Sequence, residues 1–141
     1  MSTMAVSEQE ARVLAARYGE LQQAVAVARD QITMIRGNLA ACESSIQTLT
    51  GLKEATEKGA AESIVPVGSG CLVYAEVRSV SKVIINVGAG VNIEKSADEA
   101  IEFLKNRQER FGKMMQDVNA SLTTLGRNMK DIEDKLNSGK N

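Results

Sequence analysis

Carboxylate pairs are the side chains of this sequence that come closest to a catalytic pattern. Three such pairs lie close together along the chain: Glu8 with Glu10, Glu99 with Glu102, and Asp131 with Glu133. Two neighbouring carboxyl groups can act as general acid and general base. However, the sequence has no histidine, which is the commonest general base and metal ligand. All three pairs also lie in segments with strong helical patterning, where charged residues usually face solvent. We therefore expect no catalytic residue and no enzymatic activity.

Two glycine-rich turns and two cysteines are the remaining candidates for chemistry. Gly68-Ser69-Gly70 and Gly88-Ala89-Gly90 have the glycine content of a phosphate-binding loop, but neither begins a helix or precedes the Lys-Ser/Thr of a nucleotide loop. We interpret both as hairpin turns. Cys42 and Cys71 belong to no CxxC pair and have no histidine to complete a metal site, so we expect both to be small buried apolar residues. Neither a metal ion nor a cofactor is expected.

Composition and charge exclude several classes of function. The chain has 17 basic and 18 acidic residues, mixed along its length, so it lacks the basic surface that nucleic-acid binding requires. Apolar residues make up 43% of the chain but aromatic residues only 3%, which suits helix seams and thin sheets better than a thick globular core. Residues 1–6 lack the pattern of a signal peptide, and no stretch is long enough to cross a membrane. We expect a cytoplasmic protein that binds neither nucleic acid nor membrane.

Apolar residues recur in two long segments with spacings that alternate between three and four, which is the heptad pattern of a coiled coil. The first seam runs through Leu14, Tyr18, Leu21, Val25, Ala28, Ile32, Ile35, Leu39, Cys42, Ile46 and Leu49. The second seam runs through Ile101, Leu104, Gln108, Phe111, Met115, Val118, Leu122, Leu125, Met129, Ile132 and Leu136. Ser7 and Ser96 each precede a glutamate by three residues, the pattern of a helix-starting capping box. We predict helices over residues 7–58 and 96–137.

The segment between the two seams is too short to hold the helices apart, so we expect them to fold back into an antiparallel coiled-coil hairpin. In that arrangement Leu49 lies near Ile101, and Leu14 lies near Leu136. The first helix would be about 75 Å long at 1.5 Å per residue, which is much longer than a globular helix. The sequence therefore predicts an arm whose outer end contains both chain termini.

Residues 62–95 are rich in β-branched residues between turn signals, which predicts two consecutive β hairpins. Pro66 favours an edge position for the first strand. No further amphipathic helix is available to cover these apolar strands, so we expect them to oligomerise into a β-barrel platform with other chains. The strand residues assigned to assembly are Val73, Ala75, Val77, Val83, Ile85 and Val87. The predicted fold class is mainly α with a small β part.

A few apolar residues lie outside the seams. Val6, Val13, Val27 and Met34 recur at one heptad position of the first helix, with Glu20 interrupting them. They are either scattered surface residues or an exposed apolar strip that binds unfolded partners. The methionines Met114, Met115 and Met129 are likewise open to two interpretations, as core packing or as an adaptable binding surface.

The order of long helix, two β hairpins and long helix resembles the prefoldin α family. The most specific part of the likeness is the stretch Val83-Ile84-Ile85-Asn86-Val87-Gly88-Ala89-Gly90-Val91-Asn92-Ile93-Glu94-Lys95, followed by Ala97-Asp98-Glu99-Ala100-Ile101-Glu102-Phe103. Two hairpins suit the α type, because β-type subunits have a single hairpin. Asn92 departs from related chains, which often have an aromatic residue there. The resemblance covers nearly the whole chain and implies one prefoldin-like domain over residues 1–141.

The resemblance also implies a function. Archaeal prefoldins are hexamers of two α-type and four β-type subunits, joined through a β-barrel platform from which coiled-coil arms extend. They work without ATP as holdases, capture non-native polypeptides near the arm tips and transfer them to a group II chaperonin. Carried onto this sequence, the tip residues are Met4, Val6, Val13, Leu14, Met129, Ile132 and Leu136. The alternative is a structural coiled-coil scaffold or adaptor that binds one folded partner.

Overall fold

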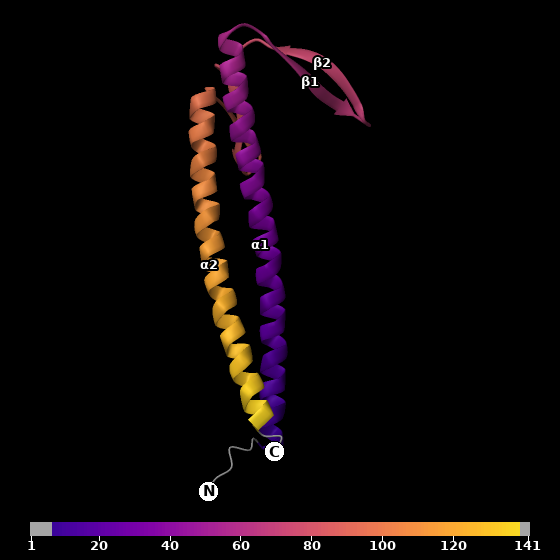
Figure 1. Cartoon of the computed structure of the whole chain (residues 1–141), viewed down its shortest axis with the longest axis vertical. Coiled ribbons are helices and arrows are strands. Elements are labelled where there is room, and N and C mark those ends of the chain that lie inside the picture. The colour runs from indigo at the N-terminus through magenta and orange to yellow at the C-terminus, as the bar shows by residue number, and fades with distance from the viewer. Residues whose placement is uncertain (1–6, 139–141) are drawn as a thin grey trace. The chain divides into compact units, whose positions relative to one another are not determined.

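Two long helices precede and follow two β hairpins along the chain in the computed structural model, which describes residues 7–138 (Figure 1). The elements follow one another as α1 (Glu8–Glu57), β1 (Ala61–Gly68), β2 (Cys71–Val77), β3 (Val83–Gly88), β4 (Val91–Lys95) and α2 (Ala97–Ser138). This arrangement confirms the predicted fold class of a helical hairpin with a small β part. Within the described residues the chain forms two compact units, one of residues 7–37 with 111–138 and one of residues 38–110.

Serine caps begin both helices. The Ser7 hydroxyl accepts a hydrogen bond from the Glu10 backbone N–H at 3.1 Å, which satisfies one of the unpaired amides at the start of α1. At the start of α2 the cap is reciprocal: Ser96 Oγ accepts from the Glu99 N–H at 3.2 Å, while the Glu99 carboxylate accepts from the Ser96 N–H at 3.4 Å. Hydrogen bonds from the Ser96 hydroxyl and N–H hold the pKa of Glu99 below its usual value. Residues 96–99 therefore form the predicted capping box.

The first unit contains the N-terminal part of α1 and the C-terminal part of α2. Every predicted seam residue in it is buried or half-buried, and Ile35 is only 1% exposed. Across the seam, the Tyr18 hydroxyl donates a hydrogen bond of 2.5 Å to the Glu133 carboxylate. Because Tyr18 is near the beginning of the chain and Glu133 near its end, this bond confirms that the two helices run antiparallel in this unit.

The second unit contains the remaining parts of both helices and the two hairpins. Gln108 donates a hydrogen bond to Glu43 at 2.9 Å, and the Lys53 ammonium lies 2.6 Å from the Asp98 carboxylate. The partner on α2 moves towards its N-terminus as the residue on α1 moves towards its C-terminus, so the helices run antiparallel in this unit too. The core of this unit contains Cys42, Ile85, Ala100 and Leu104, with the partly buried Ile46, Leu49, Val83, Val87, Ile93 and Phe103 packed against it.

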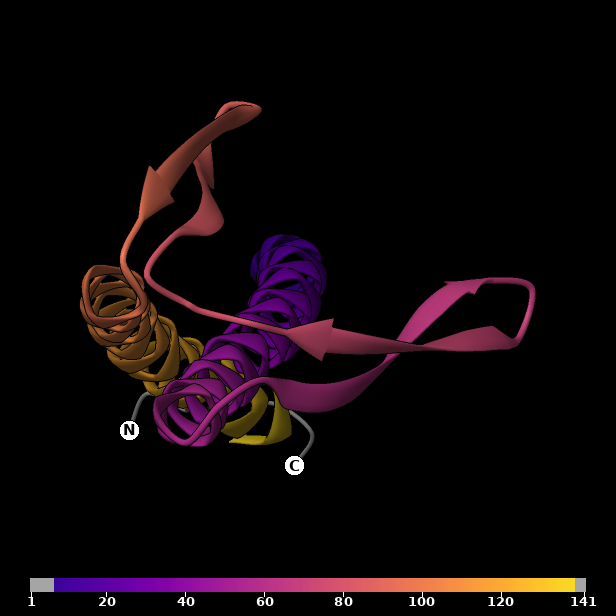
Figure 2. The ribbon, with the colours of Figure 1, turned by 90° about the horizontal axis from the view of Figure 1, so that it is seen from above.

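Each hairpin is a separate two-stranded antiparallel sheet, as Figure 2 shows. Both have a β-bulge before the turn, and the two turn residues that follow have positive φ angles: 50° and 79° at Ser69 and Gly70, 51° and 74° at Ala89 and Gly90. Two consecutive positive φ angles are typical of type I′ turns, whose twist matches that of the strands. The structure confirms that both glycine-rich segments are hairpin turns.

The hairpins differ in how much cover they have, and here one expectation was wrong. Ile85 of β3 is 9% exposed because it packs against residues of both helices. Arg107 of α2 also donates a hydrogen bond of 2.9 Å to the Asn86 carbonyl of β3. Helices of the same chain therefore cover Val83, Ile85 and Val87 of β3. This is contrary to the expectation that no helix covers these strands.

The β1–β2 hairpin remains largely exposed. On the face that contains Val73, the residues Ala75 and Val77 near the base are half-buried, whereas Val73 is 45% exposed. The opposite face is wholly exposed. A second expectation fails in this hairpin, since Cys71 is exposed while Cys42 is buried. Cys71 directly follows the turn, at the opposite end of the hairpin from the residues that connect it to the helices. No other described element covers Cys71 there.

Candidate functional surfaces

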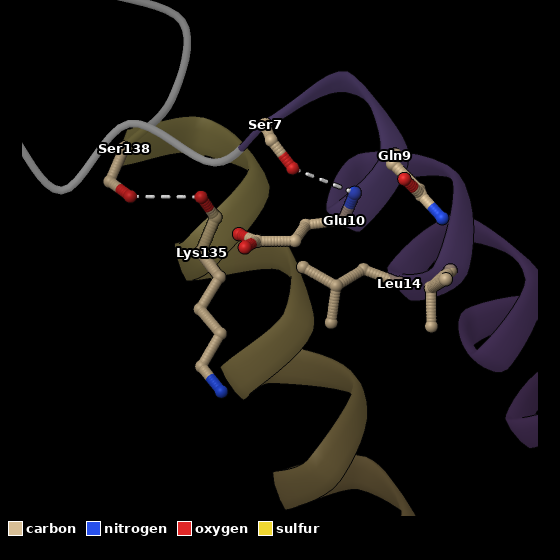
Figure 3. A pocket seen from close by; sticks show the side chains of 7 residues that line it. Ser7, Gln9, Glu10, Leu14, Lys135 and Ser138 are labelled. Atoms are coloured by element: carbon tan, nitrogen blue, oxygen red, sulfur yellow. Dashed lines mark hydrogen bonds between the residues drawn. The ribbon is translucent and has the colours of Figure 1, made fainter.

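A hollow lies between the first turns of α1 and the last turn of α2, as Figure 3 shows from close by. It has a volume of about 710 Å³ and is lined by Ser7, Gln9, Glu10, Val13, Leu14, Lys135 and Ser138. Val13 and Leu14 supply its apolar part, and Glu10 and Lys135 supply one charge of each sign. We call it the tip hollow. Leu14 is half-buried here, whereas Ile35, farther along the seam, is 1% exposed.

The structure brings only some of the predicted tip residues to an accessible surface. Val13 is 62% exposed, and Leu14, Met129 and Leu136 are half-buried. Ile132 is 5% exposed and belongs to the seam. Met4 and Val6 lie outside the described residues.

Four polar residues of the tip hollow were missed from the sequence: Gln9, Glu10, Lys135 and Ser138. They are surface residues on helices, and apart from Glu10, whose spacing from Ser7 indicates a helix cap, nothing in their types or spacing distinguishes them from other solvated positions. Only the antiparallel pairing of the two helix ends brings Glu10 and Lys135 to one hollow. The heptad register of the two helices is the one signal in the sequence that could have found them.

Val13, Val27 and Met34 form a line of exposed apolar side chains on α1, which we call the outer strip. Their exposed fractions are 62%, 57% and 58%. The fourth predicted member, Val6, is outside the described residues. Of the three methionines with two interpretations, Met115 and Met129 are half-buried in the seam, whereas Met114 is 45% exposed.

The β1–β2 hairpin presents the largest group of exposed apolar residues. Ile64, Leu72 and Tyr74 share the face opposite Val73, where they are 58%, 62% and 90% exposed. Only the Val73 face was predicted from the sequence. The signal for the second face was present, because both sets of alternating residues in these strands are apolar near the turn. An isolated two-stranded hairpin of this composition is marginal in water, so its faces need a partner.

In each of the three carboxylate pairs, one member has a structural partner. Glu8 forms an ion pair of 3.2 Å with Arg12, Glu99 takes part in the helix cap, and Glu133 accepts the Tyr18 hydrogen bond. Among residues 7–138 there is no group of three acidic or cysteine side chains that could hold a metal ion. No helix in this part of the chain combines the length and apolar content needed to cross a membrane.

Comparison with known protein families gives one extensive match. The model described as "Prefoldin subunit" matches residues 21–140. Among curated relatives, "Prefoldin subunit alpha" of Methanosarcina mazei is 42% identical over 131 residues, which cover 92% of each chain. The protein of the same description from Methanosarcina acetivorans is 43% identical over 131 residues, again with 92% of each chain covered. A more distant one from Pyrococcus horikoshii is 26% identical and covers 94% of this chain and 88% of that one.

A solved structure has the same fold. It is the cryo-EM structure of filamentous PFD from Methanocaldococcus jannaschii, to which this chain is similar with a TM-score of 0.56 and 23% sequence identity. The match covers 80% of this chain and 98% of that one.

Proposed function

Since the chain belongs to the prefoldin family of chaperones, and its relatives are α-type subunits, we propose that it is an ATP-independent holdase subunit. In this proposal it binds non-native polypeptides at the tip of its coiled-coil arm and passes them to a group II chaperonin. It performs no chemistry and needs no cofactor. We also propose that it works in the cytoplasm.

The tip hollow is the observation that carries this proposal. At the end of a coiled coil the seam residues lack neighbours on one side, so apolar surface stays accessible and the last turns open at little cost. Here Val13 is exposed and Leu14 half-buried beside an open hollow of about 710 Å³. An apolar client side chain that is fully buried there contributes roughly 1.5 to 3 kcal/mol. Such shallow contacts suit a general holdase, because several arms together give avidity without sequence specificity.

The exposed β1–β2 hairpin supports a proposal on assembly. We propose that it joins the hairpins of β-type subunits in a hexamer of two α-type and four β-type chains. Val65 and Val73 lie directly opposite each other on one face and are 41% and 45% exposed, so an added sheet would bury both. The strands have unpaired outer edges, which are templates for further strand pairing.

The test is to shorten the tips of the assembled complex by deleting residues 1–10 and 128–141. We expect the hexamer to survive, because all strand residues lie outside the deleted segments. Suppression of aggregation of several unrelated denatured proteins should fall sharply, since Val13 and Leu14 lose the turns that frame the hollow. Two shortened complexes should be compared, one with the tips shortened on this subunit alone and one with the tips shortened on all subunits, because β-type arms retain some activity. The matched control is Met114→Ser, which removes an exposed apolar side chain from α2 outside the tip.

Two results would contradict the proposal. Undiminished aggregation suppression by the complex with all tips shortened would show that clients bind elsewhere. Activity of the unmodified complex towards a single folded protein only would favour the alternative, a scaffold or adaptor.

A further inference from the structure

The two helices differ in how they distribute their apolar side chains. α1 exposes Val13, Val27 and Met34, all within the first unit, in addition to its buried seam. In the described length of α2, Met114 is the one comparable exposed side chain. A helix with apolar residues on two faces usually packs against two neighbours. α2 covers the seam face of α1, whereas the outer strip lies on another face and is exposed.

The spacing of the outer strip indicates what kind of neighbour fits it. Val13, Val27 and Met34 are separated by multiples of seven residues, so they lie on one side of the helix in a line about 30 Å long. Apolar residues at heptad spacing on another helix have the same repeat, so they can lie opposite these side chains along the whole line. The side chains of an extended strand alternate every second residue and lose register over this length. The geometry therefore favours a helical partner of about 20 residues.

The charges beside the outer strip indicate the polarity of that partner. Glu20 occupies the heptad position between Val13 and Val27, and Asp30 lies one turn from Val27 on the same side. Among residues 7–138 neither carboxylate forms an ion pair. Arg17 is the single cation that borders the strip, because Arg29 directly follows a seam residue and lies on the far side of the helix. The strip is therefore net acidic and complements a basic partner.

The outer strip is also continuous with the tip hollow. Val13 belongs to both, since it lines the hollow beside Leu14. A client segment bound at the tip can thus extend along α1 towards Met34, passing Glu20 between Val13 and Val27.

From these observations we infer that the outer strip binds amphipathic helical segments of client polypeptides, with their basic flank over Glu20 and Asp30. The inference rests on the proposed holdase function and names the class of client segment that α1 selects. Extended apolar segments use the tip hollow, whereas segments with helical propensity form a third helix against α1.

The test uses the assembled complex and a fluorescently labelled amphipathic peptide of about 20 residues, with leucine at heptad positions and lysine on its flanks. Peptide affinity is measured by fluorescence anisotropy. The double variant Val27→Ser, Met34→Ser should bind this peptide roughly tenfold more weakly, because two apolar contacts are lost. The control Met114→Ser should bind it as the unmodified complex does. Both substitutions alter exposed side chains, and circular dichroism verifies that helicity is retained.

Two further comparisons test the helical geometry and the charge. A scrambled peptide of the same composition, which cannot form an apolar face, should bind several-fold more weakly to the unmodified complex. Glu20→Lys should reverse the preference, so that a peptide with glutamate flanks binds better than the one with lysine flanks. Raising the salt concentration should weaken lysine-peptide binding to the unmodified complex.

The outcomes separate this inference from the proposed function. If the unmodified complex suppresses aggregation but the double variant binds the peptide equally well, or the scrambled peptide binds equally well, the inference is wrong and the holdase function stands. If peptide binding depends on the outer strip but the complex does not suppress aggregation, the strip is a helix-docking surface and the holdase function is wrong.

Discussion

Single residues in this chain mostly stabilise helix ends and the helix–helix interface. Glu99 completes a capping box, Glu8 pairs with Arg12 within α1, and Glu133 receives the Tyr18 hydrogen bond across the seam. The exposed pairs contribute little individually, because solvent screens them. The Tyr18 bond differs, because it joins two helices that are far apart in sequence and its donor ring is part of the seam.

This hydrogen bond predicts an alkaline loss of stability. The Glu133 carboxylate, as hydrogen-bond acceptor and then as a negative charge, raises the pKa of Tyr18 above its usual 10.0. A raised pKa in the folded state means that the contribution is complete below pH 10.0 and is lost as pH rises through the folded-state pKa. Tyr18→Phe keeps the ring but removes the hydroxyl. The unfolding midpoint of the unmodified protein should therefore fall more steeply above about pH 10 than that of Tyr18→Phe.

The measurement is chemical denaturation at a series of pH values and one protein concentration. The control is Tyr74→Phe, since Tyr74 is 90% exposed on the β1–β2 hairpin. Parallel pH profiles for Tyr18→Phe and the unmodified protein would disprove a stabilising role for this bond.

At the scale of elements, the seam stabilises the arm. Seam residues of α1 range from half-buried near the tip to nearly inaccessible at Ile35, which is 1% exposed. Its neighbour Met34 is 58% exposed on the outer strip. Adjacent residues of one helix point in directions about 100° apart, which explains why their environments differ so strongly.

This contrast predicts the result of a matched pair of substitutions. Ile35→Ala should lower the free energy of unfolding of the arm by about 2 to 5 kcal/mol, because it removes buried methyl groups and leaves a cavity. Met34→Ala should change it by less than about 0.5 kcal/mol, the usual scale for a surface substitution. Thermal unfolding followed by circular dichroism measures both. Similar destabilisation by the two variants would mean that Ile35 is not packed in the seam.

At the scale of the whole molecule, the exposed β1–β2 hairpin is the surface that we propose for assembly. The β3–β4 hairpin packs against the helices of its own chain, whereas β1–β2 exposes apolar residues on both faces. The two hairpins are therefore not equivalent for testing assembly. A charge at Ile85 would disrupt the core of its own chain, so a loss of assembly in that variant would not identify an interface.

Val73→Asp is the appropriate substitution, because Val73 is 45% exposed in the single chain. We expect it to prevent hexamer formation with β-type subunits while helicity is retained, since burial of an unpaired carboxylate in a sheet interface is costly. Native mass spectrometry and circular dichroism measure the two effects. The control Ser69→Asp places the same charge in the turn, where Asp tolerates positive φ. Full-size hexamers with Val73→Asp would contradict the assembly proposal.

Local patterns in the sequence determined the type and approximate bounds of every described element. The heptad spacing predicted all seam residues, because helical periodicity and its apolar face are properties of neighbouring positions. The Ser96 cap and the two glycine-rich turns were predictable for the same reason, since they depend on a few consecutive residues.

Only the tertiary structure decided which apolar residues are covered. Cys71 was expected to be buried like Cys42, but Cys42 packs in the seam whereas Cys71 lies exposed beside a turn. Likewise both hairpins have an apolar face, and only β3–β4 packs against α1 and α2. Cover of a hairpin depends on contacts with elements far away in the sequence, and the alternation of apolar residues within the strands does not show which hairpin receives that cover. The tip hollow, formed by the two ends of the described chain, is decided in the same way.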